Sequence, residues 1–292
     1  MRRIGLHTSI GGGLQRSLER ARDLGCGTVQ IFSHNPRGWA IRERGQDQFL
    51  AFRKLRLEYD IYPVFVHSSY LINLASKIAD LRKKSVNMVA AEMDIADAIG
   101  AEYVILHTGS ASGEDRASAR KRVISCLAEV SAKGLWKSTI LLENTAGERG
   151  DIASRIEEMG EILEALPSGL VSGICIDTCH AFSAGYDFCT ARAADLMAGE
   201  LDRHIGTDKV RLLHVNDSKD GLGSGIDRHE HIGKGKIGLT GLRNILTHPS
   251  LIDVPLILET PKKEEGDDSR NLDELKKLVS RRKRQTLRQE AS

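Results

Sequence analysis

Short apolar runs rich in β-branched residues alternate along the chain with longer segments in which apolar positions recur at helical spacing. Continuous apolar runs such as YVIL (103–106) and TILL (139–142) are typical of parallel strands that are buried on both faces. The pattern predicts eight strands: Arg3–His7, Val29–Ser33, Val64–His67, Tyr103–His107, Thr139–Glu143, Gly173–Asp177, Val210–His214 and Leu256–Glu259.

Helical patterns lie between the predicted strands, at Leu14–Leu24, Ala79–Ile99, Arg116–Ser131, Ile152–Leu166, Arg192–Asp202, Leu239–Thr247 and Leu272–Val279. This alternation over 292 residues predicts an α/β fold, a single (β/α)8 TIM barrel. A doubly wound open sheet is the alternative, but the glycines of SIGGGLQRS (9–17) do not have the GxGxxG spacing of such folds. We expect residues 1–279 to form the barrel and the basic segment 280–292 to form a flexible tail.

Nearly every predicted strand ends in a histidine or a carboxylate. In a β/α barrel the C-terminal ends of the strands meet on one face, where active sites are built. A single polar residue at a strand end is more often a hydrogen-bonded structural residue than a metal ligand, but here seven strands repeat the feature: His7, His67, His107, Glu143, Asp177, His214 and Glu259. The remaining strand is followed by Ser33 and His34.

Two loops add side chains that bind metals. DTCHAF (177–182) places His180 three residues after Asp177, and DRH (227–229) places Asp227 and His229 at alternate positions. Crowded imidazoles and carboxylates are costly to bury unless cations neutralise them. Imidazole and carboxylate ligands without thiolate favour zinc or manganese. Nine candidate ligands suit two or three ions rather than one: His67, His107, His180, His214, His229, Asp177, Asp227, Glu143 and Glu259.

Metal clusters of this composition suit phosphodiester hydrolysis, because they stabilise both oxygens of an in-line displacement. Sugar isomerisation in a two-metal barrel is the main alternative, and a non-enzymatic metal-storing or DNA-binding scaffold is a weaker one. The loops FSHNPRGWA (32–40) and HSSYLINLAS (67–76) favour the nuclease. They carry Arg37, Trp39, Tyr70 and Leu71, and arginine with apolar loop tips is how proteins wedge into base stacks. Packing over the barrel rim is the alternative for the three apolar residues.

Overall composition narrows the class of protein only slightly. A net charge of +2 neither requires nor excludes a nucleic-acid partner, although Lys234 and Lys236 in a glycine-rich segment could contact phosphates. The five cysteines have irregular spacings, which predicts buried thiols in a reducing cytosol. No apolar run has the length of a membrane span, and the first residues do not resemble a signal peptide. We therefore expect a cytoplasmic protein that does not contact membranes.

Three segments resemble the endonuclease IV family of abasic-site (AP) endonucleases: HSSYLINLA (67–75), GICIDTCHAFSAGYD (173–187) and LLHVNDSKDGLGSGIDRHEHIGKG (212–235). The strand-end pattern extends the resemblance from His7 to Glu259. It implies a TIM barrel with three zinc ions, and the ligand types allow manganese at some of the sites. It also implies cleavage of the phosphodiester 5′ to an abasic site in duplex DNA, which leaves a 3′-hydroxyl and a 5′-deoxyribose phosphate. We expect no obligate protein partner, and a monomer.

The resemblance also implies roles for individual residues. Glu143 and Glu259 are the expected catalytic residues, and Glu143 would bridge two of the zinc ions. The matched ligands of the three ions are His67, His107 and Glu143; Glu143, Asp177, His214 and Glu259; and His180, Asp227 and His229. Arg37, Tyr70 and Leu71 match residues that penetrate the duplex at the lesion and flip the abasic nucleotide out. His231 falls outside the matched ligands, and Gly38 stands where the family commonly has a larger polar residue.

Overall fold

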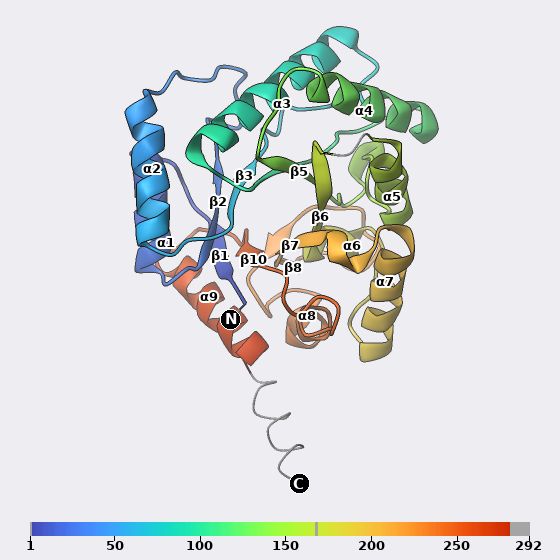
Figure 1. Ribbon diagram of the computed structural model, residues 1–292. Coiled ribbons are helices and arrows are strands. Elements are labelled where there is room, and N and C mark those ends of the chain that lie inside the picture. The colour runs from blue at the N-terminus through green and yellow to red at the C-terminus, as the bar shows by residue number, and fades with distance from the viewer. Residues whose placement is uncertain (1, 167–168, 281–292) are drawn as a thin grey trace.

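A closed barrel of parallel strands forms the centre of the protein in a computed structural model, which describes residues 2–166 and 169–280. Figure 1 shows the strands surrounded by helices. Within the described residues the barrel has eight strands, each paired with the next along the chain: β1 (Ile4–His7), β2 (Thr28–Phe32), β3 (Val64–His67), β4 (Tyr103–Leu106), β5 (Thr139–Glu143), β6 (Val171–Asp177), β7 (Val210–His214) and β10 (Leu256–Leu258). Pairing of β1 with β10 closes the ring, which confirms the predicted TIM barrel.

The outer layer consists of α1 (Leu14–Asp23), α2 (Gln46–Glu58), α3 (Ala79–Ile99), α4 (Arg116–Ser131), α5 (Ile156–Ala165), α7 (Ala191–His204), α8 (Gly238–Leu246) and α9 (Asp267–Ser280). The sequence pattern did not predict α2. Its apolar periodicity is weak because only Phe52 and Arg56 are buried, whereas Leu50 and Leu57 are exposed. Helix α5 begins four residues later than predicted, since Ala153 adopts a left-handed conformation (φ 72°) that a regular α-helix does not accommodate.

A second, smaller hydrophobic cluster fills the inside of the barrel, separate from the main core between strands and helices. It contains one buried residue from each of six strands, and every one of them precedes a predicted ligand by two positions. These pairs are Phe65 and His67, Ile105 and His107, Leu141 and Glu143, Cys175 and Asp177, Leu212 and His214, and Ile257 and Glu259. Because side chains alternate between the faces of a strand, residues two apart both point inward. The apolar layer therefore supports the polar one.

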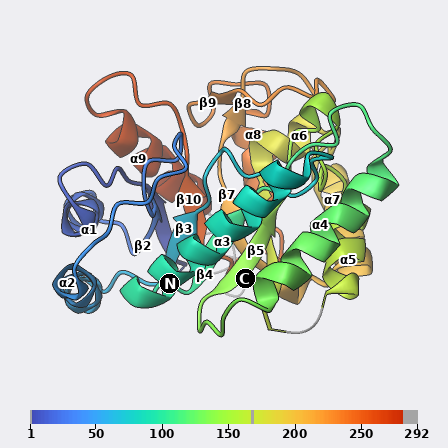
Figure 2. The ribbon, with the colours of Figure 1, turned by 90° about the horizontal axis from the view of Figure 1, so that it is seen from above.

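The loops after β6 and β7 fold over the barrel opening. Helix α6 (Thr178–Ser183) follows β6 directly, and β8 (Asp217–Ser218) pairs with β9 (His229–Glu230) in an antiparallel ribbon. Figure 2 shows β8 and β9 on the side of the molecule away from the N-terminus. Pairing of Ser218 with His229 returns the distal part of this loop to the ends of the strands.

Two further expectations concern the whole chain. All five cysteines lie in the described ranges and are unpaired, four of them buried, as predicted. Across the described residues no helix has the length and apolar character needed to cross a membrane. The predicted tail, 280–292, lies outside the described residues from position 281 onward, and Ser280 is the last residue of α9.

Candidate metal centre

The nine predicted ligands come together at the carboxyl ends of the strands. Four of them are the last residues of β3, β5, β6 and β7, and His107 and Glu259 follow β4 and β10 by one position. The other three lie in α6, in the loop after β8, and in β9. They form three groups with donor atoms within 4.8 Å: His67, His107 and Glu143; Glu143, Asp177, His214 and Glu259; and His180, Asp227 and His229.

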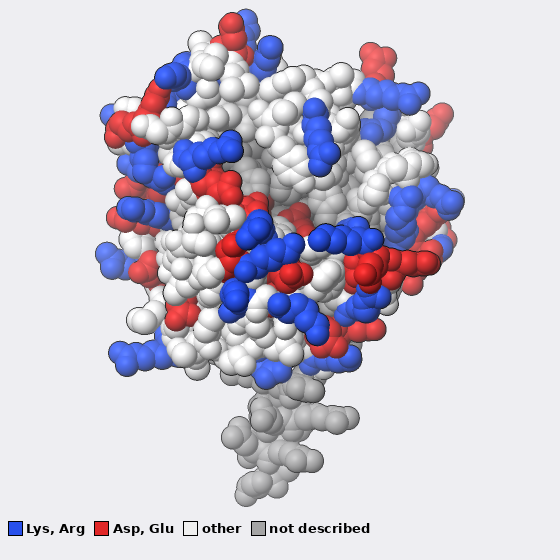
Figure 3. Space-filling model, turned by 180° about the vertical axis from the view of Figure 1, so that it is seen from behind, with Lys and Arg blue, Asp and Glu red and all other residues white. Residues whose placement is uncertain are grey.

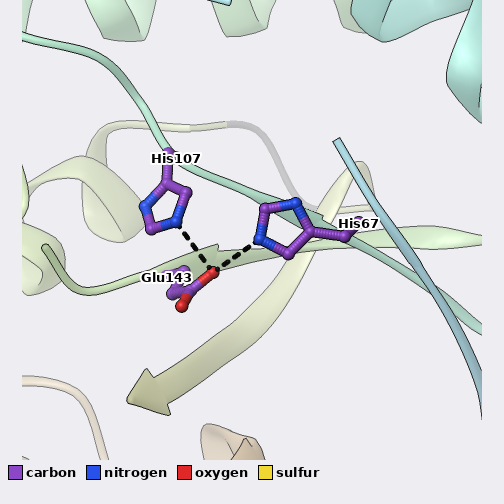
Figure 4. A group of neighbouring side chains, drawn as sticks. All are labelled: His67, His107 and Glu143. Atoms are coloured by element: carbon purple, nitrogen blue, oxygen red, sulfur yellow. Dashed lines mark ion pairs between the residues drawn. The ribbon is translucent and has the colours of Figure 1, made fainter. Parts of the chain in front are cut away.

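The first group is built around one oxygen of Glu143. Oε2 lies 3.3 Å from Nε2 of His67 and 3.2 Å from Nε2 of His107 (Figure 4). His67 donates its Nδ1–H to the carbonyl oxygen of Ser68 at 2.8 Å, which directs Nε2 toward the carboxylate. Oε2 of Glu143 has no hydrogen-bond partner among the described residues, although it is completely buried. This oxygen is therefore available to a cation.

The second group shares Glu143 with the first. Its other oxygen, Oε1, lies 2.9 Å from Nδ1 of His214, and Oε2 of Glu259 lies 3.3 Å from the same nitrogen. The opposite ring nitrogen of His214 donates to Oε1 of Gln30 at 2.7 Å. Asp177 completes the group, with Oδ2 at 4.0 Å from Nδ1 of His214. All four ligands are buried or nearly so.

The third group lies on the loops. Oδ1 of Asp227 is 3.1 Å from Nε2 of His180 and 3.2 Å from Nε2 of His229, and the two ring nitrogens are 3.4 Å apart. His180 donates its other ring N–H to the carbonyl of Asn144 at 3.0 Å, and His229 donates to the carbonyl of Glu259 at 3.1 Å. Two imidazoles held in this way present their remaining nitrogens to one point, as metal-binding histidines do.

The histidines and carboxylates of the cluster shift one another's pKa values. Burial by itself would lower the pKa of His67, but the carboxylates of Glu143 and Glu259 outweigh it and raise that pKa to about 9. Burial likewise opposes the effect of Asp177 and Asp227, which raise the pKa of His229 to about 9. Burial would raise the pKa of Glu143, yet the neighbouring histidines hold it well below its usual value. The cluster thus favours charged carboxylates with positive charge between them.

In the first and third groups the spacing of the donor atoms fits zinc. Tetrahedral zinc with bonds of about 2.0–2.1 Å places neighbouring ligand atoms about 3.3–3.4 Å apart. The contacts within the first and third groups are 3.1–3.4 Å. Two thiols, Cys175 and Cys179, border the cluster. Cys175 lies with Glu143 and His214, and Cys179 with Asp177 and His229. Burial raises the pKa of Cys179 to about 12, and that of Cys175 also lies far above its usual value, which disfavours thiolate ligands; the thiolate-free site stays a prediction.

Sequence reasoning missed two residues that orient the ligands. Gln30, on β2, accepts from His214 and donates from Nε2 to Oε1 of Glu259 at 2.5 Å. Asn216 donates to Oδ2 of Asp177 at 2.6 Å and accepts from the backbone N–H of Glu259 at 3.0 Å. A polar residue inside an otherwise apolar strand was the available signal for Gln30. Asn216 stands two positions after His214, within a segment quoted for its family resemblance.

The loops beside the cluster carry the predicted DNA-contacting residues. Arg37 and Tyr70 are exposed and Leu71 is half-buried. The ring of Tyr70 lies 6.0 Å from that of His67, measured between centroids, which places it at the edge of the metal centre. Figure 3 looks onto this face and shows a hollow with charged side chains around it. His231 belongs to none of the candidate metal groups of the described residues, and its Nδ1 accepts from Asn271 of α9 at 2.9 Å.

Comparison with known proteins identifies the family of this chain. The family model of the xylose isomerase-like TIM barrel matches residues 18–281. A probable endonuclease 4 from Methanoculleus marisnigri is 40% identical over 277 residues, which are 94% of this chain and 98% of that protein. A probable endonuclease 4 from Halothermothrix orenii is 40% identical over 260 residues, covering 89% and 94% of the two chains.

Solved structures give the same result. Endonuclease IV from Thermus thermophilus superposes with a TM-score of 0.83 at 34% identity, covering 96% of this chain and 99% of that chain. A D-tagatose 3-epimerase-like protein has a TM-score of 0.73 at 20% identity, with 97% and 99% covered, and that likeness shows the fold alone. By the extent of its match to the curated relatives, the chain belongs to the endonuclease IV family of AP endonucleases.

Proposed function

We propose that this protein is a zinc-dependent endonuclease of DNA repair. It hydrolyses the phosphodiester 5′ to an abasic site in duplex DNA and leaves a 3′-hydroxyl and a 5′-deoxyribose phosphate. The observation that carries the proposal is the convergence of nine imidazole and carboxylate ligands in three groups, two of which share Glu143. The relatives named probable endonuclease 4 and the solved endonuclease IV support a DNA-cleaving activity.

Three zinc ions are proposed, with manganese as a substitute at some sites. The first is held by His67, His107 and Glu143, and the second by Glu143, Asp177, His214 and Glu259; His180, Asp227 and His229 hold the third. Zinc, when bound, supplies the Lewis acidity that makes water nucleophilic near neutral pH and neutralises charge on the phosphodiester oxygens.

The side chains of this protein position the reactants. Glu143 and Glu259 are the proposed catalytic residues, because their carboxylates face each other across Nδ1 of His214. Arg37, Tyr70 and Leu71 are proposed to enter the duplex. Their exposed or half-buried position beside the cluster would let the flipped abasic nucleotide reach the bound ions. Phosphate contacts from Lys234 and Lys236, both exposed, fit the same proposal.

A sugar epimerase or isomerase is the second candidate, since barrels with that chemistry share the fold. The third ligand group disfavours it. Such an enzyme needs two metals and would tolerate loss of Asp227 and His229, which here converge with His180 on one point.

The decisive experiment combines elemental analysis with cleavage of a duplex that carries one tetrahydrofuran abasic site. We expect three zinc ions per chain and a single cut 5′ to the lesion, abolished by chelator and restored by zinc. Two bound metals and an intact oligonucleotide would instead favour the isomerase.

Substitution of the two proposed catalytic carboxylates tests their role. Glu143→Gln and Glu259→Gln should lower turnover by several orders of magnitude while DNA binding is retained, because the charge between the metals is lost. Glu102→Gln is the matched control, since Glu102 lies at the opposite end of the barrel, where it accepts from the backbone of Val64. Wild-type cleavage by Glu143→Gln would exclude the assignment.

The protein is proposed to act as a monomer in the cytoplasm, where duplex DNA is its partner. The unpaired thiols are compatible with that reducing compartment.

A further inference from the structure

Two neighbouring loops next to the metal centre each carry an exposed aromatic side chain. Trp39 is 37% exposed on the loop after β2, residues 33–40, hereafter the Arg37 loop. Tyr70 is 62% exposed on the loop after β3, residues 68–76, hereafter the Tyr70 loop. Both loops are fully described and contain no helix or strand. Their separation is therefore set by hydrogen bonds and packing rather than by regular structure.

Ser69 joins the two loops. Its side chain is buried, and its Oγ donates to the carbonyl of Pro36 in the Arg37 loop at 2.8 Å. The same oxygen accepts from the backbone N–H of Leu71 at 3.3 Å. The backbone N–H of Ser69 donates to Oε1 of Glu92 on α3 at 2.9 Å. One residue thus connects the Arg37 loop, the tip of the Tyr70 loop and a helix of the barrel.

Glu92 is an unusual residue for its position. It is completely buried on the inner face of α3, and its Oε2 has no hydrogen-bond partner in the described part of the chain. Its other oxygen lies 3.6 Å from Nδ1 of His34, which is also buried and which belongs to the Arg37 loop. A buried carboxyl with one oxygen unsatisfied lowers stability, and an apolar residue would pack there at less cost. Folding alone therefore does not account for it.

We propose that Ser69 and Glu92 are positioning residues that hold the Arg37 loop and the Tyr70 loop at the separation needed for both to engage one DNA lesion. Glu92 contacts both loops, through Ser69 and through His34, and Ser69 links them directly. Two recognition elements fixed in advance lose less conformational entropy when they bind than two that move independently. The inference rests on the proposed function, because it presumes an abasic duplex as the ligand.

Three substitutions and a control test this network. Ser69→Ala removes both side-chain hydrogen bonds of Ser69, and Glu92→Leu removes the acceptor on α3. Glu92→Gln keeps an oxygen that can accept from the backbone N–H of Ser69, so this variant should behave like the wild type. Ser85→Ala is the matched control, because Ser85 of α3 accepts from the backbone of Asn73 at 3.0 Å but does not link the two loops.

The primary measurement is the ratio of dissociation constants for intact and tetrahydrofuran-containing duplexes, determined with zinc-loaded protein in the Glu143→Gln background so that cleavage is suppressed. We expect Ser69→Ala and Glu92→Leu to lower this preference about fivefold to tenfold, as expected for loss of one or two hydrogen bonds. The fluorescence rise of a 2-aminopurine placed beside the lesion should fall in parallel. Zinc content and turnover at saturating DNA should stay unchanged, so the defect appears in KM and not in kcat.

An unchanged preference for the abasic duplex in Ser69→Ala and Glu92→Leu would overturn the inference. An equal loss of preference in Ser85→Ala, or in Glu92→Gln, would also overturn it. If the wild-type protein itself binds both duplexes equally, the proposed function fails first. That outcome can be told apart from failure of the Ser69–Glu92 inference, because it is seen with the wild-type protein alone.

Discussion

Zinc added to the metal-free protein at pH 7 should displace protons, because neighbouring carboxylates raise the pKa of several of the predicted ligand histidines. The pKa of His67 and that of His229 are each raised to about 9, and those of His180 and His214 are also raised. The pKa of His107 is lowered by burial, so this ring is already neutral. Zinc binds only the unprotonated nitrogen. We therefore expect protons to be released, about one each from His67 and His229, with a further contribution from His180 and His214.

The pKa of the histidines sets how strongly protons compete with zinc. pH 7 lies two units below a pKa of about 9, so only about one in 100 of such histidines is unprotonated. The proton therefore weakens the apparent zinc affinity about 100-fold, or about 3 kcal/mol. The raised histidine pKa values also make the stability of the metal-free protein depend on pH. A raised pKa stabilises the folded metal-free protein below about pH 6.5, and this contribution is lost as the pH rises through about 9. Metal-free protein should thus become less stable across that range.

The assay is proton release measured with a pH indicator in weakly buffered solution as zinc is titrated into chelator-treated protein. His229→Gln should release about one proton fewer than wild type, and this difference should shrink to about half at pH 9. His231→Gln is the control, because His231 lies outside the metal groups and should leave the release unchanged. Equal proton release by His229→Gln and wild type at pH 7 would refute the reasoning.

Three other perturbations have expected outcomes of their own. Gln30→Ala removes the hydrogen bond that orients His214 and should weaken zinc binding about 10-fold to 100-fold, measured by chelator competition; unchanged affinity would contradict this role. Phe65→Ala empties part of the barrel interior and should lower the free energy of unfolding by about 3–5 kcal/mol in urea titrations, with a loss below about 1 kcal/mol arguing against tight packing there. Burial raises the pKa of Glu92 to about 8, so the free energy of unfolding should fall as the pH rises from about 4.5 to 8. Glu92→Gln should abolish this pH dependence in urea titrations. If the dependence persists in the variant, another group causes it.

The sequence by itself determined the barrel and the convergence of its ligands. A buried parallel strand reads as a continuous apolar run, and a polar residue at its end stands out against that background. Because the period of a strand is two, His67 lies inward whenever Phe65 does, and the same holds for Glu143 and Leu141. Repetition around a closed ring then places such residues on one face, and this required no knowledge of distances.

Other features of the site depended on the tertiary structure. Residue spacing did not divide nine ligands into groups; the family resemblance suggested the division, and the contacts of Glu143 support it. Helix α2 escaped prediction because its buried face is too small to produce a helical pattern. The roles of Gln30 and Glu92 did not follow from the sequence, for a common reason. Each takes its role from hydrogen bonds to residues distant in the chain, and such bonds exist only once strands, loops and helices have packed together.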